Sequence, residues 1–430
     1  MTANQKPGLI RQNVFYSLLD YVSQPAMMIL AAPVLLKTLG IQQYGAWMLV
    51  NSIAATAGGL GGGFGDGATK FISMYRGRND NEGVARSLAA ALAINCALGF
   101  LLATGLVVCA PLLIGHVFQV EPALRHDGIV AVRISALVLL LRFAQAVFMS
   151  AVRGYERYRP VVAASVSSRV LIVVLAVVFT AKGFGLVGIL WATLAVEAAT
   201  LVVLAIIACA ILQVRSLPTT VIRAGVREVS AFGAFTWLKS VMGVLFGYAD
   251  RLIVAALLGT GPLALYVLCN QLTQPIQALL ASGFNFLFPN VSARSASGKW
   301  IECQSSYRAA TLVSVCIVAA ICLPMIFAAR GVLAVWLGPG IAERCRGLLI
   351  AMTIGNGLLA ICVVPHYTAL ALGRSRSLAY MNLAAGIASL TGVYVLVRHV
   401  GLIGGGVGKV FAGLISLSAF AIVRPVFKLS

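Results

Sequence analysis

Apolar residues occur along this chain in long runs, each about the length of one membrane span. A helix needs about 20 apolar residues to cross the hydrocarbon core, where its own hydrogen bonds satisfy the backbone polar groups. The pattern predicts about twelve such helices, with little room between them for a soluble domain. The expected spans are residues 13–36, 44–67, 87–114, 129–151, 161–181, 185–212, 230–257, 262–288, 307–329, 347–371, 378–397 and 402–423.

Composition supports an all-α polytopic membrane protein over a soluble one. Of the 430 residues, 60% are hydrophobic and 10% are charged, whereas about 25% of residues are charged in an average soluble domain. This is too little charge to cover a water-exposed surface. The first span also lacks a small-residue cleavage site after a short apolar stretch, so we expect it to be retained rather than removed as a signal peptide.

The placement of basic residues predicts the orientation of the chain. If the N-terminus is cytoplasmic, 19 of the 32 Lys and Arg residues lie in segments on that side and seven on the opposite side. Cytoplasmic loops of membrane proteins carry such an excess. Both termini are therefore expected in the cytoplasm and the protein in the inner (plasma) membrane. Orientation and contact with anionic lipid head groups account for the net charge of +20, so no nucleic-acid partner is expected.

A faint internal repeat predicts two six-helix lobes, residues 1–215 and 216–430. Three pairs of glycines recur at nearly constant spacing, each pair at the same kind of element boundary. The pairs are Gly40 and Gly259, Gly154 and Gly373, and Gly185 and Gly401, separated by 219, 219 and 216 residues. Both lobes would begin in the cytoplasm, as in alternating-access carriers built from parallel repeats. A duplicated bundle without a transport path is the alternative.

Ionisable residues inside the expected spans indicate where a transport path would lie. Each costs from about 2.5 kcal/mol upward at the centre of a span, so such groups usually face protein or a wet cavity. The candidate substrate-binding cations are Arg142, Arg169, Lys239 and Arg251. The interior acids are Asp20, Asp66, Glu197 and Asp250. Arg133, Arg251 and Lys409 lie close enough to a span end to extend to the interface. The excess of cations predicts a cavity that attracts an anion or an anionic head group.

Two spacing relations refine this picture. Lys239 and Asp250 are eleven residues apart, about three helical turns, and therefore share one face. Arg169 and Glu197 lie on consecutive spans at depths that would allow them to pair. Buried pairs can fix helix register instead of binding a substrate. The four acids are accordingly candidates for ion or proton coupling or for charge pairing.

No cofactor, metal site or catalytic group is predicted. The nine cysteines are scattered without a C-x-x-C pair, and the four histidines are isolated. The segment Gly404–Lys409 resembles a phosphate loop but lacks its first glycine and its final Ser or Thr. Close helix packing explains these glycines better. Since the sequence has no nucleotide-hydrolysing module, uphill transport would draw on an ion gradient or the membrane potential.

Four segments of the chain resemble bacterial polysaccharide flippases. They are Asn13-Val-Phe-Tyr-Ser17, the segment 37–47 (KTLGIQQYGAW), Gly63-Phe-Gly-Asp-Gly67 and Tyr248-Ala-Asp-Arg-Leu252. Together with length and span number they are similar to the Wzx-type exporters of O-antigen and exopolysaccharide repeat units, in the superfamily of the MATE drug exporters and the lipid II flippase. The resemblance implies a flippase that moves undecaprenyl-pyrophosphate-linked oligosaccharides across the inner membrane by alternating access, for surface polysaccharide biosynthesis. It implies membrane lipids and polysaccharide polymerase or export machinery as partners. Arg142, Arg169, Lys239 and Arg251 would then supply a cationic cavity.

Other classes stay open at this point. A MATE-like multidrug or cation antiporter would need an acidic cavity with an aromatic lining, and the excess of interior cations argues against it. An exporter of another lipid or of a teichoic-type polymer shares most of these features. A lipid-linked-sugar enzyme, such as a polymerase or ligase, usually needs a long outer loop for its catalytic groups. The longest expected outer loops, near residues 115–128 and 330–346, have only about 15 residues, so we expect a transporter and no enzyme.

Overall fold

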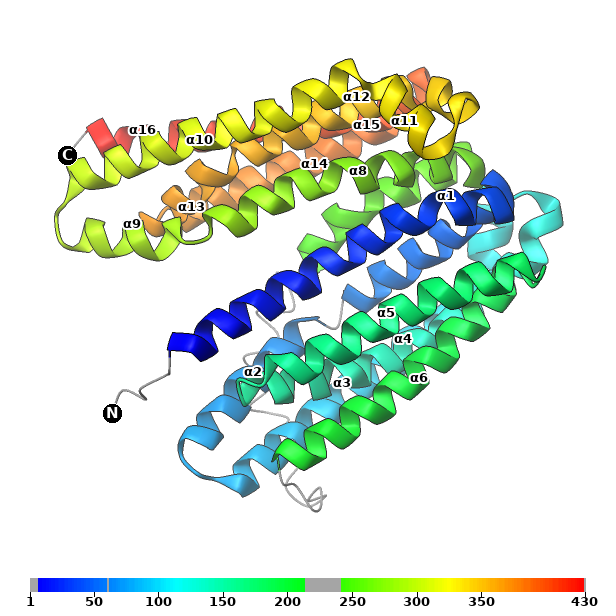
Figure 1. The fold of residues 1–430 in the computed structure, drawn as a ribbon, viewed down its shortest axis with the longest axis horizontal. Coiled ribbons are helices and arrows are strands. Elements are labelled where there is room, and N and C mark those ends of the chain that lie inside the picture. Colours follow the sequence, from blue (N-terminus) through cyan, green and yellow to red (C-terminus); the bar gives the residue numbers. More distant parts are fainter. Residues whose placement is uncertain (1–6, 60–61, 213–240, 429–430) are drawn as a thin grey trace. The chain divides into compact units, whose positions relative to one another are not determined.

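The computed structural model describes residues 7–59, 62–212 and 241–428, and these are helical almost throughout (Figure 1). No β-strand occurs among them, which confirms the all-α fold. The chain divides into two compact units, Met1–Leu252 and Ile253–Ser430, here called unit 1 and unit 2. The division falls inside the helical segment Val241–Leu258. The predicted lobe boundary at residues 215 and 216 lies outside the described residues and stays a prediction.

Unit 1 is a bundle in which α4 is the central helix. Its elements are α1 (Pro7–Gly59), α2 (Gly62–Gly77), α3 (Asn81–Leu112), a π-helical turn (Leu113–Val117), a 3-10 turn (Pro122–Leu124), α4 (Arg125–Gly154), α5 (Tyr158–Ala181) and α6 (Gly185–Leu212). Helix α4 contacts α1, α2, α3, α5 and α6, while α5 also packs against α1 and α6. Side chains of α4 can therefore reach partners on most of the surrounding helices.

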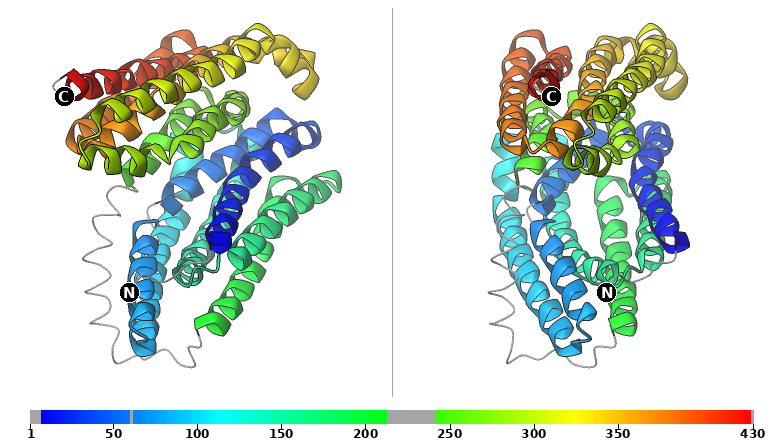
Figure 2. Two further views of the ribbon diagram at one scale, coloured as in Figure 1. Left: turned by 60° about the vertical axis from the view of Figure 1, so that its left-hand side comes forward. Right: turned by 90° about the vertical axis from the view of Figure 1, so that its left-hand side faces the viewer.

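Unit 2 is a second helical bundle, in which α10, α12, α14 and α15 lie side by side (Figures 1 and 2). Its elements are α8 (Thr260–Phe284), α9 (Leu287–Ala296), α10 (Trp300–Phe327), α11 (Ala329–Leu337), α12 (Pro339–Ile361), α13 (Val363–Ala371), α14 (Ser375–Val400), α15 (Leu402–Ser416) and α16 (Ser418–Lys428). Helix α12 packs against α8, α10 and α15. This places α8 and α15 on the same side of the bundle, where they also contact each other.

The described residues contain ten helices that are long and apolar enough to cross a membrane. Two features account for the difference from the twelve expected spans. Helix α1 contains the first expected span and most of the second, which join at the non-helical residue Gly40. Helix α8 stands where the eighth span was expected but is too polar to be counted among the ten. The second expected span also ends too early, because α2 continues as a helix to Gly77.

Two of the three glycine pairs of the predicted repeat have matching backbone conformations, whereas Gly373 has a positive φ and Gly154, the last residue of α4, does not. Gly40 and Gly259 have φ of 72° and 88°, and Gly185 and Gly401 have φ of 57° and 74°. Residues with a Cβ rarely adopt this left-handed region. In each pair a new helix or helical segment begins directly after or at the glycine. The same turn is therefore made at equivalent places in the two halves, which supports a duplicated scaffold.

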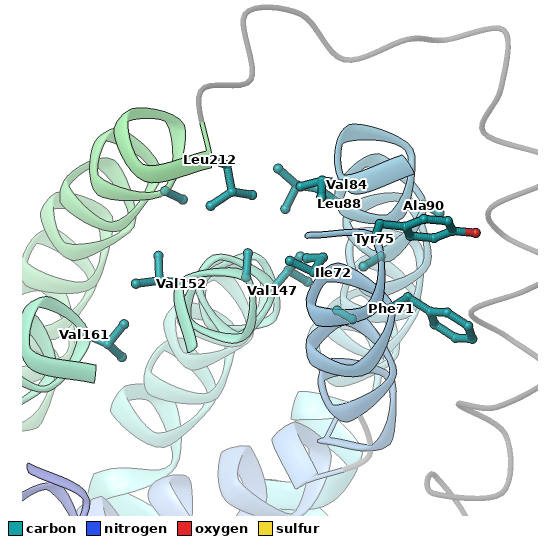
Figure 3. Close-up of a cluster of buried hydrophobic side chains, with 14 residues drawn as sticks. Phe71, Ile72, Tyr75, Val84, Leu88, Ala90, Val147, Val152, Val161 and Leu212 are labelled. Atoms are coloured by element: carbon teal, nitrogen blue, oxygen red, sulfur yellow. The ribbon is translucent and has the colours of Figure 1, made fainter. Parts of the chain in front are cut away.

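A hydrophobic cluster holds together one end of unit 1. It contains Phe71, Ile72 and Tyr75 of α2, Val84 and Leu88 of α3, and Val147, Val152, Val161 and Leu212 of α4, α5 and α6. Figure 3 shows Ile72 on the side toward Val147, whereas the Phe71 and Tyr75 rings point away from α4. Ile72, Val147, Val152 and Val161 have no exposed surface. Because five helices contribute, this cluster fixes the ends of α2, α4 and α5 relative to one another.

The glycine run of α15 is a helix-packing surface rather than a phosphate loop. Gly404, Gly405, Gly406 and Gly408 are buried within the helix. A Cβ at Gly408 would lie 2.6 Å from the backbone nitrogen of Val393 on α14, closer than real Cβ atoms approach. The absence of side chains lets the α14 and α15 backbones approach closely, and the expectation of close packing is confirmed.

We predict that Gly408→Ala destabilises the protein by about 1–3 kcal/mol, the usual cost of overpacking a tight site. The new methyl group must displace the α14 backbone. The measurement is the thermal unfolding midpoint in detergent micelles. Gly105→Ala on α3 is the matched control, because nothing lies within 4 Å of its new Cβ. Equal midpoints for the two variants would contradict the packing argument.

Candidate functional site

Asp20 is the centre of a polar cluster formed by α1, α4 and α5. Arg169 of α5 approaches its Oδ1 at 2.9 Å, and Arg153 of α4 approaches its Oδ2 at 3.3 Å. The same Arg169 nitrogen donates to the Asp20 backbone carbonyl at 2.6 Å and to the Ser23 hydroxyl at 2.7 Å. We call Asp20, Ser23, Arg153 and Arg169 the Asp20 cluster. Its one carboxylate is shared by two guanidinium groups, so the cluster carries net positive charge.

A polar pocket of about 510 Å³ opens beside the Asp20 cluster. It is lined by Asp20, Thr69, Lys70, Ser150, Arg153, Tyr158 and Val162. The lining therefore combines two basic groups and three hydroxyls with a single carboxylate that is already paired. Phosphate-bearing groups suit such a surface, because charged donors and hydroxyls both donate hydrogen bonds to phosphate oxygens.

The chain turn between α4 and α5 places the pocket at one end of unit 1. The Gly154 carbonyl that precedes this turn accepts hydrogen bonds from Ser73 at 3.1 Å and from Arg76 at 3.3 Å, both on α2. The Arg76 guanidinium also lies 5.1 Å from the Tyr155 ring centroid. Together with the hydrophobic cluster of Figure 3, these contacts fix the positions of α2, α4 and α5, which line the pocket. This is the end that the basic loops predict to be cytoplasmic.

A second polar cluster joins α4 to α6 deeper in the bundle. The Glu197 carboxylate accepts hydrogen bonds from Arg142 at 2.9 and 2.7 Å on one oxygen and from Gln145 at 2.9 Å on the other. Gln145 also donates to the Glu197 backbone carbonyl at 2.8 Å. The Glu197 side chain is only 7% exposed, whereas that of Arg142 is 47% exposed. We call these three residues the Glu197 cluster. Its buried carboxylate is fully compensated, while its cation stays accessible on one side.

Comparison with known proteins shows the family of the chain. Residues 10–295 match the family model described as polysaccharide biosynthesis protein. The chain belongs to the polysaccharide biosynthesis protein family. Among curated proteins, a Shigella flexneri protein assigned as an O-antigen transporter is 24% identical over 177 residues, which are 40% of this chain and 41% of that relative.

Solved structures show that this family member has the fold of MOP superfamily transporters. A multidrug resistance MATE family transporter in its inward-facing conformation is similar with a TM-score of 0.80 and 16% identity, covering 96% of this chain and 98% of the other. The lipid II flippase MurJ is similar with a TM-score of 0.78 and 13% identity, covering 96% and 87%. The predicted structural class, a multi-pass membrane protein with two lobes, is confirmed by these similarities. These relatives are transporters and a flippase rather than enzymes.

The structure brings together four of the eight residues singled out from the sequence, but in different pairs from the one expected. Arg169 was expected to pair with Glu197, and this is wrong. Helix α5 packs against both α1 and α6, and Arg169 lies on the face toward α1, where Asp20 is its partner. Glu197 lies on the α4 side of α6 and pairs with Arg142.

Of the remaining four residues, the structure describes the side chains of Asp250 and Arg251. The Arg251 guanidinium lies 4.9 Å from the Tyr248 ring centroid, and its backbone N–H donates to the Asp250 carboxylate at 2.8 Å. Lys239 and the Asp66 side chain lie outside the described residues, so the expected shared face of Lys239 and Asp250 stays a prediction.

Three cluster members were missed from the sequence. Arg153 is eleven residues from Arg142 and so shares its helix face, but it lies just beyond the fourth expected span (129–151) and was not among the charges singled out inside spans. Gln145 and Ser23 carry no charge, and a search for ionisable residues passes over them. The eleven-residue spacing of Arg142 and Arg153 on one helix was the sequence signal that could have identified Arg153.

We predict that Arg142→Leu destabilises the fold by about 1–3 kcal/mol, because it leaves the buried Glu197 carboxylate short of a donor. The double variant Arg142→Leu/Glu197→Gln should recover most of this loss, since no charge is then left uncompensated. Thermal unfolding in detergent measures both effects. Arg330→Leu is the control, because its pair with Glu343 is 72% and 65% exposed and should contribute less than about 1 kcal/mol. A double variant no more stable than Arg142→Leu would contradict the pairing argument.

Proposed function

We propose that this protein is a flippase for undecaprenyl-pyrophosphate-linked oligosaccharide repeat units, which it moves across the bacterial inner membrane for surface polysaccharide biosynthesis. The match of residues 10–295 to the polysaccharide biosynthesis protein family carries this proposal. The name of the Shigella relative, an O-antigen transporter, points to the same substrate class. Translocation would proceed by alternating access, with the lipid tail in the bilayer and the polar head inside the protein.

The charge pattern of unit 1 supports an anionic substrate. The pocket beside the Asp20 cluster has two basic groups and one paired carboxylate in its lining, and Arg142 remains half exposed beside the neutralised Glu197. Both features attract a pyrophosphate rather than an organic cation. In this proposal Arg142, Arg169, Lys239 and Arg251 contribute the cationic surroundings of the head group, and Arg153 and Lys70 join them.

The contacts of Asp20 and Glu197 favour a role in charge pairing over a role in ion coupling. Asp20 is shared by Arg153 and Arg169, and both oxygens of Glu197 accept hydrogen bonds. A carboxylate held by guanidinium donors binds a sodium ion weakly, because the ion would compete with a fixed positive charge. The membrane potential is therefore the simpler driving force. An anionic head that moves outward gains about 2.3 kcal/mol per charge per 100 mV when the inside is negative.

A MATE-like drug exporter is the second candidate, because the fold of MATE transporters matches as well as that of the lipid II flippase. Fold alone does not decide between them. The family match and the cationic pocket favour the flippase. The phenotype of a strain that lacks the gene distinguishes the two functions.

We expect a deletion strain to accumulate lipid-linked oligosaccharide on the cytoplasmic face of the inner membrane and to lose surface polysaccharide, because unflipped repeat units cannot be polymerised outside. The wild-type gene should restore both. The measurement is lipid extraction combined with labelling by a membrane-impermeant reagent. Normal polysaccharide together with new sensitivity to cationic drugs would instead support the MATE-type exporter. Repeat units that reach the outer face but stay unpolymerised would point to an enzyme.

We further predict that Lys239→Ala and Arg142→Gln/Glu197→Gln each lower export by about tenfold or more at unchanged protein level, the scale of a lost charge-assisted hydrogen bond. The double variant removes the cation without leaving a buried carboxylate unpaired. Lys182→Ala, an exposed residue after α5, is the control and should export normally. Full export by both test variants would contradict a cationic substrate site.

A further inference from the structure

Helix α8 of unit 2 has an unusual row of amide side chains. Asn270, Gln274 and Gln277 lie at spacings of four and three residues on one face, and Gln271 lies beside them. Asn270 is buried, Gln271 and Gln277 are partly buried, and Gln274 is exposed. These amides make α8 too polar to be counted among the apolar spans. We call these four residues the α8 amide row.

Contacts within unit 2 orient the row. Lys409 of α15 donates to the Asn270 side-chain oxygen at 2.5 Å, and its ammonium group lies 5.6 Å from the Tyr266 ring centroid. The Asn270 amide nitrogen in turn donates to the Gln274 side-chain oxygen at 3.3 Å. The chain from Lys409 to Gln274 fixes which end of each amide donates and which accepts. Exposed Gln274 is its outer member.

Two further hydrogen-bonding groups lie on the same turns of α8. Among the described residues, the buried side-chain oxygen of Gln271 has no hydrogen-bond partner. Pro275 has no N–H, so the Gln271 backbone carbonyl lacks its ordinary helical donor. Buried polar groups without partners are costly in a membrane span. They are therefore expected to meet water or a polar ligand.

The duplicated scaffold does not require this row. At the 219-residue spacing that relates Gly40 to Gly259, the row corresponds to Asn51, Ser52, Ala55 and Gly58 of α1. At the 216-residue spacing that relates Gly185 to Gly401, Lys409 corresponds to Thr193. Only the first amide recurs, and the Asn51 side chain bonds to Trp47 of its own helix. The additional amides and the lysine are thus specific to unit 2, which a purely architectural role would not explain.

We propose that the α8 amide row binds the sugar hydroxyl groups of the lipid-linked oligosaccharide. Each amide has both donors and an acceptor, which match hydroxyl groups that also donate and accept. Neutral amides recognise sugars without the strong hydration of charged side chains. A row about ten ångströms long, seven residues at about 1.5 Å per residue, spans roughly two sugar rings. This inference rests on the proposed flippase function and assigns the recognition of the oligosaccharide to unit 2.

The test compares two lipids that share the same head anion. The probes are undecaprenyl pyrophosphate and the undecaprenyl-pyrophosphate-linked oligosaccharide isolated from the deletion strain, and the full-length protein is reconstituted in lipid nanodiscs. Loss of two neutral hydrogen bonds in Gln274→Ala/Gln277→Ala should weaken binding of the glycosylated lipid by about tenfold. Binding of the sugar-free lipid should change less than about twofold. Gln274→Ala removes the acceptor of the buried Asn270 amide, so the double variant should unfold at a somewhat lower temperature than wild type. Its unchanged affinity for the sugar-free lipid then shows that the variant is folded.

Asn51→Ala is the matched control, because it removes the equivalent amide from unit 1 and should alter neither affinity. Gln274→Asn, which keeps the amide on a shorter stem, should retain part of the preference for the glycosylated lipid. Equal wild-type affinity for the two lipids, or a double variant that binds the glycosylated lipid like wild type, overturns the inference and leaves the flippase function standing. Equal weakening for both lipids also overturns it. If wild-type protein binds neither lipid, the proposed function fails and the inference fails with it.

Discussion

The cost of placing a carboxylate inside a membrane protein determines how unit 1 is built. Asp20 and Glu197 lie on helices that do not follow each other in sequence, and each is neutralised by arginine from other helices. Helix α4 supplies an arginine to both clusters, Arg142 to one and Arg153 three turns later to the other. These pairs connect α1 and α6 to α4, and Arg169 connects α5 to α1. The guanidinium groups that satisfy the acids also leave unit 1 with an excess of positive charge beside the polar pocket.

The same scaffold is used for different chemistry in unit 2. Matching left-handed glycines show that both halves turn at equivalent places, yet unit 2 has only two acidic residues, Glu302 and Glu343. Glu302 pairs with Lys299, three residues earlier, and Glu343 of α12 pairs with Arg330 of the preceding helix α11. Lys409 is instead held by a neutral amide and an aromatic ring. Polar interactions inside unit 2 are therefore largely those of uncharged side chains, such as Asn356 with Thr273.

Hydrophobic pattern was enough to predict the fold, because a helix is the only open-chain structure that satisfies its own backbone in lipid. The hydrophobic pattern gave wrong helix bounds or span numbers where a helix contains many polar residues. Helix α8 is helical despite its amides, and α2 continues to Gly77 through a polar stretch. The sequence lists the charged residues of the expected spans but not their partners, since the direction of Arg169 depends on the rotation of α5 about its axis. Hydropathy contains no such information. Uncharged residues of the polar clusters, such as Gln145, could not be identified from the sequence, because only their contacts in the structure distinguish them from packing residues.

The divergence of the two units matches the chemistry of the substrate that we propose, a lipid-linked oligosaccharide. Its pyrophosphate is anionic and needs cations whose charge is not fully cancelled, as unit 1 provides with Lys70, Arg153 and the exposed side of Arg142. Its sugars are neutral and would be recognised poorly by guanidinium groups, which bind carboxylates and phosphates best. Amides of fixed orientation serve sugars better, and these are concentrated on α8. A transporter of hydrophobic cations would need neither arrangement, so the joint presence of both is a more selective indication of substrate class than the fold that they share with drug exporters.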